Sequence, residues 1–140
     1  MRKAFLGVST LLAAAAIAAC GTSEGSSEKA REEEGRASPD EAASEIATIE
    51  QMLERALAKY GRGDAGEAEE LVGDAYLDHF ERVESQLEER DARLMAKLED
   101  LLSKTIRDGM KRGEPEDEVG DLVAEAKNAL DEAETLLSSG

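Results

Sequence analysis

The side chains best suited to chemistry lie together in one short stretch of the chain. Tyr76, the only histidine (His79), Glu81 and Glu84 fall within about two and a half turns if the stretch is helical. Neutral imidazole suits iron, copper and zinc, whereas carboxylate and phenolate oxygens suit harder cations. The stretch therefore predicts a metal site formed by these four residues, with iron or copper as the candidate metal.

Helix packing explains the same residues in another way. At about 100° per residue, one helix face collects the apolar and aromatic side chains Val72, Tyr76, His79, Val83 and Leu87. The opposite face collects the acids Asp74, Asp78, Glu81 and Glu88. On this interpretation His79 and Tyr76 fill a core, and the pattern alone favours packing over metal ligation. Both interpretations stay open at this point.

A wider set of carboxylates bears on the metal hypothesis. Glu84, Glu50 and Glu134 each flank the apolar stripe of a different predicted helix, so three helices could turn one carboxylate toward a common seam. A ferritin-like di-iron centre needs Glu-x-x-His on two helices. Position 76 is tyrosine and the chain has one histidine, so we do not expect a di-iron centre.

Catalytic patterns are missing from the sequence. A hydrolytic triad needs a nucleophile within reach of an oriented base, and no serine lies at helical reach of His79. Gly61-Arg62-Gly63 is too short for a phosphate-binding loop and is typical of a turn between helices. We therefore expect a protein that is not an enzyme.

The chain is strongly acidic, with 33 Asp and Glu against 17 Lys and Arg among 140 residues. Such a surface repels nucleic acid phosphates and anionic lipid head groups, so neither is an expected partner. It attracts cations and basic proteins. One cysteine, Cys20, excludes an internal disulfide and any multi-cysteine metal site.

The first 19 residues have the pattern of a signal peptide. Arg2 and Lys3 precede an apolar run from Ala4 to Ala19, shorter than the ~20 residues of a membrane-spanning helix. Ile17-Ala18-Ala19-Cys20 resembles the bacterial lipobox, which predicts cleavage before Cys20 and lipidation of its thiol. We therefore expect an extracytoplasmic protein anchored by lipid to the cell membrane or the outer membrane, in the periplasm or at the cell surface.

The rest of the chain divides into a linker and one helical domain. Residues 20–37 comprise the lipidated cysteine and a Gly-, Ser- and charge-rich segment without an apolar period, which predicts a flexible linker. Residues 38–140 carry helical periodicity throughout and predict an all-α domain. Ser38-Pro39-Asp40-Glu41 predicts a capping box, and Asp64-Ala65-Gly66-Glu67 predicts a second one.

The expected helices follow from these start and stop signals. The first runs from Pro39 to Tyr60 and ends at Gly61 with a positive φ; the second runs to about Arg90. Asp91 caps the third, which ends at Gly109 or Gly113, and Pro115 starts the fourth. Short connections favour antiparallel neighbours, so we expect a four-helix up-down-up-down bundle, or alternatively two packed helical hairpins.

The stretch from Ala75 to Glu84, Ala-Tyr-Leu-Asp-His-Phe-Glu-Arg-Val-Glu, resembles the extracytoplasmic helical domain of bacterial and archaeal Ftr-type high-affinity iron permeases. The resemblance extends to Tyr60-x-x-Gly63-Asp64-x-x-x-Ala68, to Glu89-Arg90-Asp91-x-x-Leu94 and to the helix from Val119 to Leu137. It implies a helical module on the outer face of a membrane that is associated with iron delivery. The chain lacks the permeases' membrane helices and Arg-Glu-x-x-Glu motifs, so it would work beside a permease.

Two functional hypotheses follow. The first is an accessory lipoprotein for uptake or binding of iron or another metal cation, with an iron permease as partner. The second is a structural or adaptor lipoprotein whose bundle binds another envelope protein without metal.

Overall fold

The structure is a computed structural model that describes residues 37–139. The predicted signal peptide (residues 1–19), Cys20 and the linker up to residue 36 lie outside the described residues. Within the described range all regular structure is helical and no strand occurs, which confirms the all-α prediction. None of these helices is long and apolar enough to cross a membrane.

Helix α2 (Pro39–Tyr60) begins with the predicted capping box. The Glu41 amide donates to the Ser38 hydroxyl at 3.3 Å, and the Ser38 amide donates to Glu41 Oε2 at 2.7 Å. These bonds satisfy amide groups that have no partner inside the helix. The other end of α2 is fixed by Tyr60, whose hydroxyl donates to the Glu114 carbonyl at 2.5 Å.

The turn after α2 differs from the prediction in two ways. Gly61 has a right-handed φ of −61°, and the positive φ, +90°, is at Gly63 instead. At Gly61 an added Cβ would meet only the movable end of the Glu116 side chain, 2.5 Å from a carboxylate oxygen. The predicted second capping box is also wrong, since Asp64 makes no side-chain cap bond to helix α3 (Ala65–Asp74), and Glu67 pairs with Lys59 instead.

The second helical segment is continuous from α3 through η1 (Ala75–Phe80) into α4 (Glu81–Asp100). Segment η1 is a π-helix, which has a wider turn than an α-helix and holds about one residue more per turn. Asp91, with φ −150° and ψ 90°, breaks α4, and its Oδ1 accepts the amides of Arg93 and Leu94 at 2.9 and 3.0 Å. The prediction that the chain turns at Asp91, with this residue as a helix cap, is confirmed.

The chain then returns through the second half of α4, a second π-helix η2 (Leu101–Thr105) and α5 (Ile106–Arg112). Gly113 ends α5 in the left-handed conformation, with φ +69°, which confirms one of the two predicted stops. Pro115 precedes α6 (Glu116–Ser138), whose first turn carries three acids that complement the positive end of the helix dipole.

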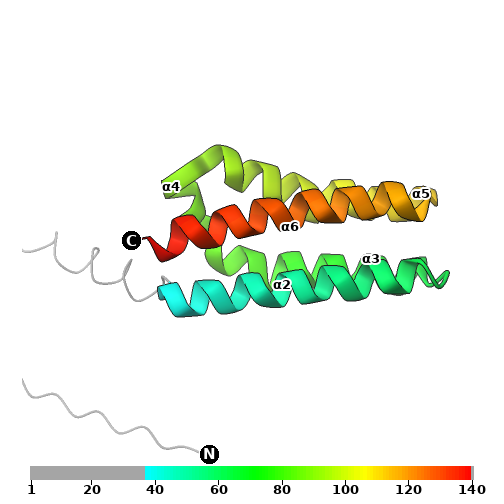
Figure 1. Ribbon diagram of the computed structural model, residues 1–140, viewed down its shortest axis with the longest axis horizontal. Helices are drawn as coiled ribbons and strands as arrows, with labels where there is room; N and C mark the ends of the chain where they lie inside the picture. The colour runs from blue at the N-terminus through cyan, green and yellow to red at the C-terminus, as the bar shows by residue number, and fades with distance from the viewer. Residues whose placement is uncertain (1–36, 140) are drawn as a thin grey trace, which may run out of the picture.

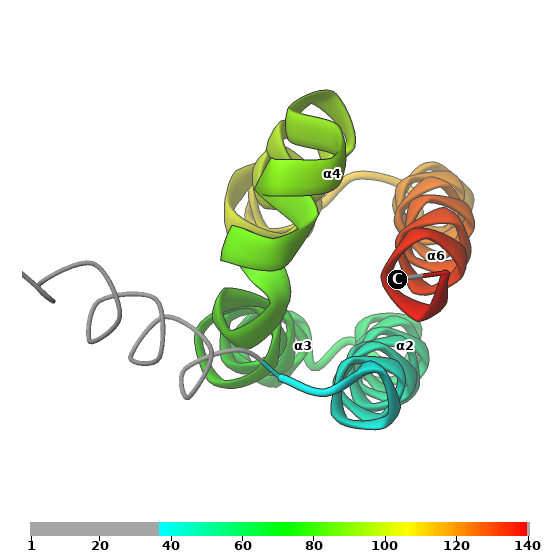
Figure 2. The same ribbon diagram turned by 90° about the vertical axis from the view of Figure 1, so that its left-hand side faces the viewer.

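The helices pack around one apolar core. Helix α2 contacts both α3 and α6, α3 contacts α5, and α4 contacts α6, so that α2 lies between α3 and α6 when the molecule is viewed from its end (Figure 2). The start of α2 and the end of α6 lie at one end of the molecule, and the α2–α3 turn lies at the other (Figure 1). No charged or polar residue of the described range is fully buried.

Candidate functional site

The π-helix η1 decides which of the candidate side chains enter the core. Ala75 and Phe80 are fully buried at 0% exposure, whereas Tyr76 and His79 are half-buried and Leu77 is 57% exposed. The Tyr76 ring stacks on Phe80 with a centroid separation of 6.0 Å and an angle of 26° between planes. The prediction that Tyr76 and His79 occupy the middle of the buried face is therefore wrong, and Phe80 takes that place.

His79 lies on the flank of its segment that faces α2. Its Nδ1 is 2.6 Å from Oε2 of Glu45, and Oε1 of the same carboxylate accepts from Arg82 Nη1 at 2.8 Å. Burial acts to raise the pKa of Glu45, but the hydrogen bonds from His79 and Arg82 outweigh it and hold that pKa below its ordinary value. A neutral His79 that donates through Nδ1 would present Nε2 as its lone-pair atom.

Tyr76 is half-buried and packs against the edge of the core. Burial raises the pKa of the Glu84 carboxyl, and the negative charges of Glu99, Glu81 and Glu88 raise it further. Burial also raises the pKa of the Tyr76 phenol, followed by the charges of Glu84, Glu99 and Glu81. We call Tyr76, Glu84 and Glu99 the acidic seam, because the charges of Glu84 and Glu99 act on Tyr76 and the charge of Glu99 acts on Glu84.

The structure thus groups three of the four predicted site residues and separates the fourth. The charges of Glu81 and Glu84 act on Tyr76, whereas His79 pairs with Glu45 on α2. Sequence reasoning missed Glu45 and Glu99. Glu99 could have been found, since Glu84 and Glu99 lie at nearly equal distances on either side of the predicted Asp91 turn, and such positions face each other in a helical hairpin.

The expected common seam of Glu50, Glu84 and Glu134 is not formed. Burial raises the pKa of Glu50 first, and the charges of Asp131, Glu134 and Glu54 add to it, while Lys127 opposes them. Glu50 and Glu134 thus interact between α2 and α6, whereas Glu84 interacts with Glu99. Among residues 37–139, no group of three or more His, Cys, Asp or Glu side chains is arranged to hold a metal ion.

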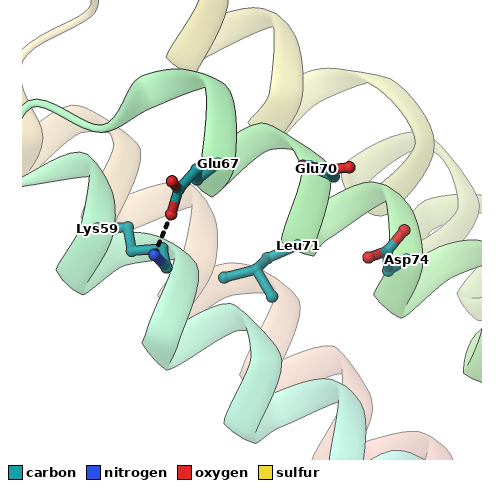
Figure 3. Close-up of a pocket in the computed structure, with 5 residues that line it drawn as sticks. All are labelled: Lys59, Glu67, Glu70, Leu71 and Asp74. Atoms are coloured by element: carbon teal, nitrogen blue, oxygen red, sulfur yellow. Dashed lines mark hydrogen bonds and ion pairs between the residues drawn. The ribbon is translucent and has the colours of Figure 1, made fainter.

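A groove of about 250 Å³ lies between α2 and α3 (Figure 3). One of its walls carries an ion pair between Lys59 Nζ and Glu67 Oε2. The apolar part of its lining is Leu71, which lies between Lys59 and Asp74 in the close-up (Figure 3). Glu70 and Asp74, both exposed, complete the lining. We call these five residues the α2–α3 groove.

No family model, no curated protein and no solved structure matches the chain.

Proposed function

We propose that the chain is a lipid-anchored extracytoplasmic protein whose helical domain assists the uptake of a metal cation, with iron as the first candidate. In this proposal residues 1–19 are removed as a signal peptide and Cys20 carries the lipid. Residues 21–37 link the anchor to the helical domain, and the partner is a membrane permease.

The observation that carries the metal proposal is the acidic seam. Two oxygen-bearing groups on the same segment, the Tyr76 phenol and the Glu84 carboxyl, have raised pKa values, in each case first from burial and then from the charges of neighbouring acids. A raised pKa at a half-buried carboxyl means that its negative charge is poorly compensated, so a bound cation would relieve the repulsion. Phenolate and carboxylate oxygens are ligands that hard cations such as Fe³⁺ accept. We propose that Tyr76, Glu84 and Glu99 hold the cation, with Glu81 beside them.

For the architecture, we propose an up-down-up-down four-helix bundle in place of two separate helical hairpins. In this arrangement α2 and α6 are two of the rods, α3 through η1 to Arg90 is another, and Asp91 through η2 to α5 is the last. The proposal is supported by the contacts of α2 with α6 and of α3 with α5, which join the two hairpins into one core.

Titration with ferric citrate tests the metal proposal. The full-length chain purified in detergent should bind iron saturably and develop the visible charge-transfer band of a ferric phenolate. Tyr76→Phe should abolish the band, whereas Tyr60→Phe, the matched variant of the only other tyrosine, should keep it. The metal proposal is wrong if no saturable binding occurs, or if the band survives in the Tyr76 variant.

Membrane fractionation tests the anchor separately. Cys20→Ser should move the protein from the membrane fraction to the soluble fraction after processing. Retention of that variant in the membrane would contradict lipid anchoring, and it would leave the metal proposal standing.

A docking function is the second candidate, in which the domain binds a protein partner without metal. The α2–α3 groove favours it, because the groove combines an apolar residue with carboxylates that face solvent. Binding of a purified envelope permease by the Tyr76→Phe variant as well as by the parent chain would favour docking over metal delivery.

A further inference from the structure

The charges of the α2–α3 groove are unbalanced. Lys59 is the one cation of its lining, and it is already paired with Glu67. Glu70 and Asp74 lie one turn apart on α3, and within residues 37–139 neither forms a salt bridge. Like charges at this spacing on a helix repel each other. A cationic ligand between the two carboxylates would reduce that repulsion.

The size and lining of the groove restrict the kind of cation. A volume of about 250 Å³ has room for about eight water molecules, far more than one bare metal ion needs. Leu71 is half-buried and packs against the core, so it offers an apolar surface to part of the occupant. An occupant with an aliphatic stem and a charged head fits both parts of the lining.

We propose that the α2–α3 groove receives one basic side chain, arginine by preference, from a protein partner. Its methylene groups would lie on Leu71 and its guanidinium would lie between Glu70 and Asp74. Arginine is preferred because its planar group can donate to two carboxylates at once. This inference rests on the docking function proposed above and is independent of the acidic seam.

The position of the groove suits a partner that approaches from outside the membrane. Lys59 is next to the last residue of α2, and this helix begins with Pro39 at the opposite end of the molecule (Figure 1). A helix of 22 residues is about 33 Å long. A lipid at Cys20 would therefore leave the groove at the end of α2 that is farther from the attachment point.

Nuclear magnetic resonance titration of the full-length chain in detergent tests the proposal, with N-acetyl-arginine amide as probe. We expect saturable shifts of the Lys59 and Leu71 amide signals. N-acetyl-citrulline amide, which has the same shape without the charge, should bind at least fivefold more weakly. The double variant Glu70→Gln/Asp74→Asn should weaken arginine binding at least fivefold, and the charge-matched variant Glu118→Gln/Asp121→Asn on α6 should change it less than twofold.

Several results would overturn the proposal. Equal weakening by the two double variants would show attraction to the whole acidic surface, and equal binding of citrulline would exclude charge recognition. Displacement of the probe by millimolar Mg²⁺ with the same shifts would identify a metal ion as the occupant. If the probe leaves Lys59 and Leu71 unchanged while a permease still binds the chain, docking stands and the groove is the wrong site.

Discussion

Replacement of Phe80 by alanine is the most direct test of the π-helix η1. Phe80 is fully buried and stacks on Tyr76, whereas Leu77 in the same segment is 57% exposed. An aromatic ring of this kind buries about 150–250 Å², which corresponds to about 4–6 kcal/mol at about 25 cal/mol per Å². Alanine keeps the Cβ, so we expect Phe80→Ala to cost about 3–5 kcal/mol. That is a large part of the total stability of a small domain, about 5–15 kcal/mol.

Urea unfolding followed by far-ultraviolet circular dichroism measures this cost, and Leu77→Ala is the matched control. We expect the Leu77 variant to lie within about 0.5 kcal/mol of the parent chain. If η1 were an ordinary α-helix with the predicted face inward, His79→Ala would be the costly change and Phe80→Ala a mild one. A larger loss of stability for His79→Ala than for Phe80→Ala would therefore show that the π-helix does not turn Phe80 into the core.

Three further predictions concern charge and backbone. Because the pKa of Glu84 is raised above its ordinary 4.5, folding disfavours its ionised form, so Glu84→Gln should raise the melting temperature at neutral pH and change it little below pH 4. The control Glu132→Gln, at an exposed position away from both ends of α6, should change the melting temperature at neither pH. Because the pKa of Glu45 is lowered below 4.5, its ionised form stabilises the folded protein above that pH, and this stabilisation disappears as the pH falls through the folded pKa. Glu45→Gln should therefore lower the free energy of unfolding in urea by about 1–2 kcal/mol at neutral pH and by less in acid. Gly120→Ala should stabilise α6 by about 0.5–1 kcal/mol, since the atom nearest to the added Cβ would be 3.8 Å away. Gly63→Ala should cost about 1–2 kcal/mol, because Gly63 has a φ of +90°. The same unfolding assay compares the two variants, and equal effects would contradict the left-handed conformation of Gly63.

Local signals near helix ends were predictable where one residue's chemistry decides the structure. Ser38 with Glu41, and Asp91 with the amides after it, cap their helices as their sequences indicate. The Asp64 box failed because Glu67, its other member, has a stronger partner in Lys59 across the turn. That competition depends on how α2 and α3 meet, which no local pattern contains.

The register inside η1 could not be obtained from periodicity. On an ideal α-helix, the residues predicted to face inward, which include Tyr76 and His79, spread over about 80° of the helix circumference. The residues observed to face inward, which include Ala75 and Phe80, would spread over about 140°. The one extra residue that a π-helix accommodates reduces the spread of the observed residues to about 80° as well. The two registers are then equally regular, and burial decides between them, because a phenyl ring enters the core without the desolvation that an imidazole and a phenol would need.

The second π-helix, η2, also keeps apolar side chains on the core, and this explains the position of the acidic seam. Leu98, Leu102, Ile106 and Met110 are buried at steps of four, and an ideal α-helix would turn this stripe by about 40° at each step. The wider turn of η2 reduces that drift and keeps the stripe on the core, and η2 contacts η1 across it. Both segments on either side of Asp91 therefore keep their apolar faces inward. The polar residues next to those faces, Tyr76 and Glu84 on one segment and Glu99 on the other, are left along the line where the segments meet.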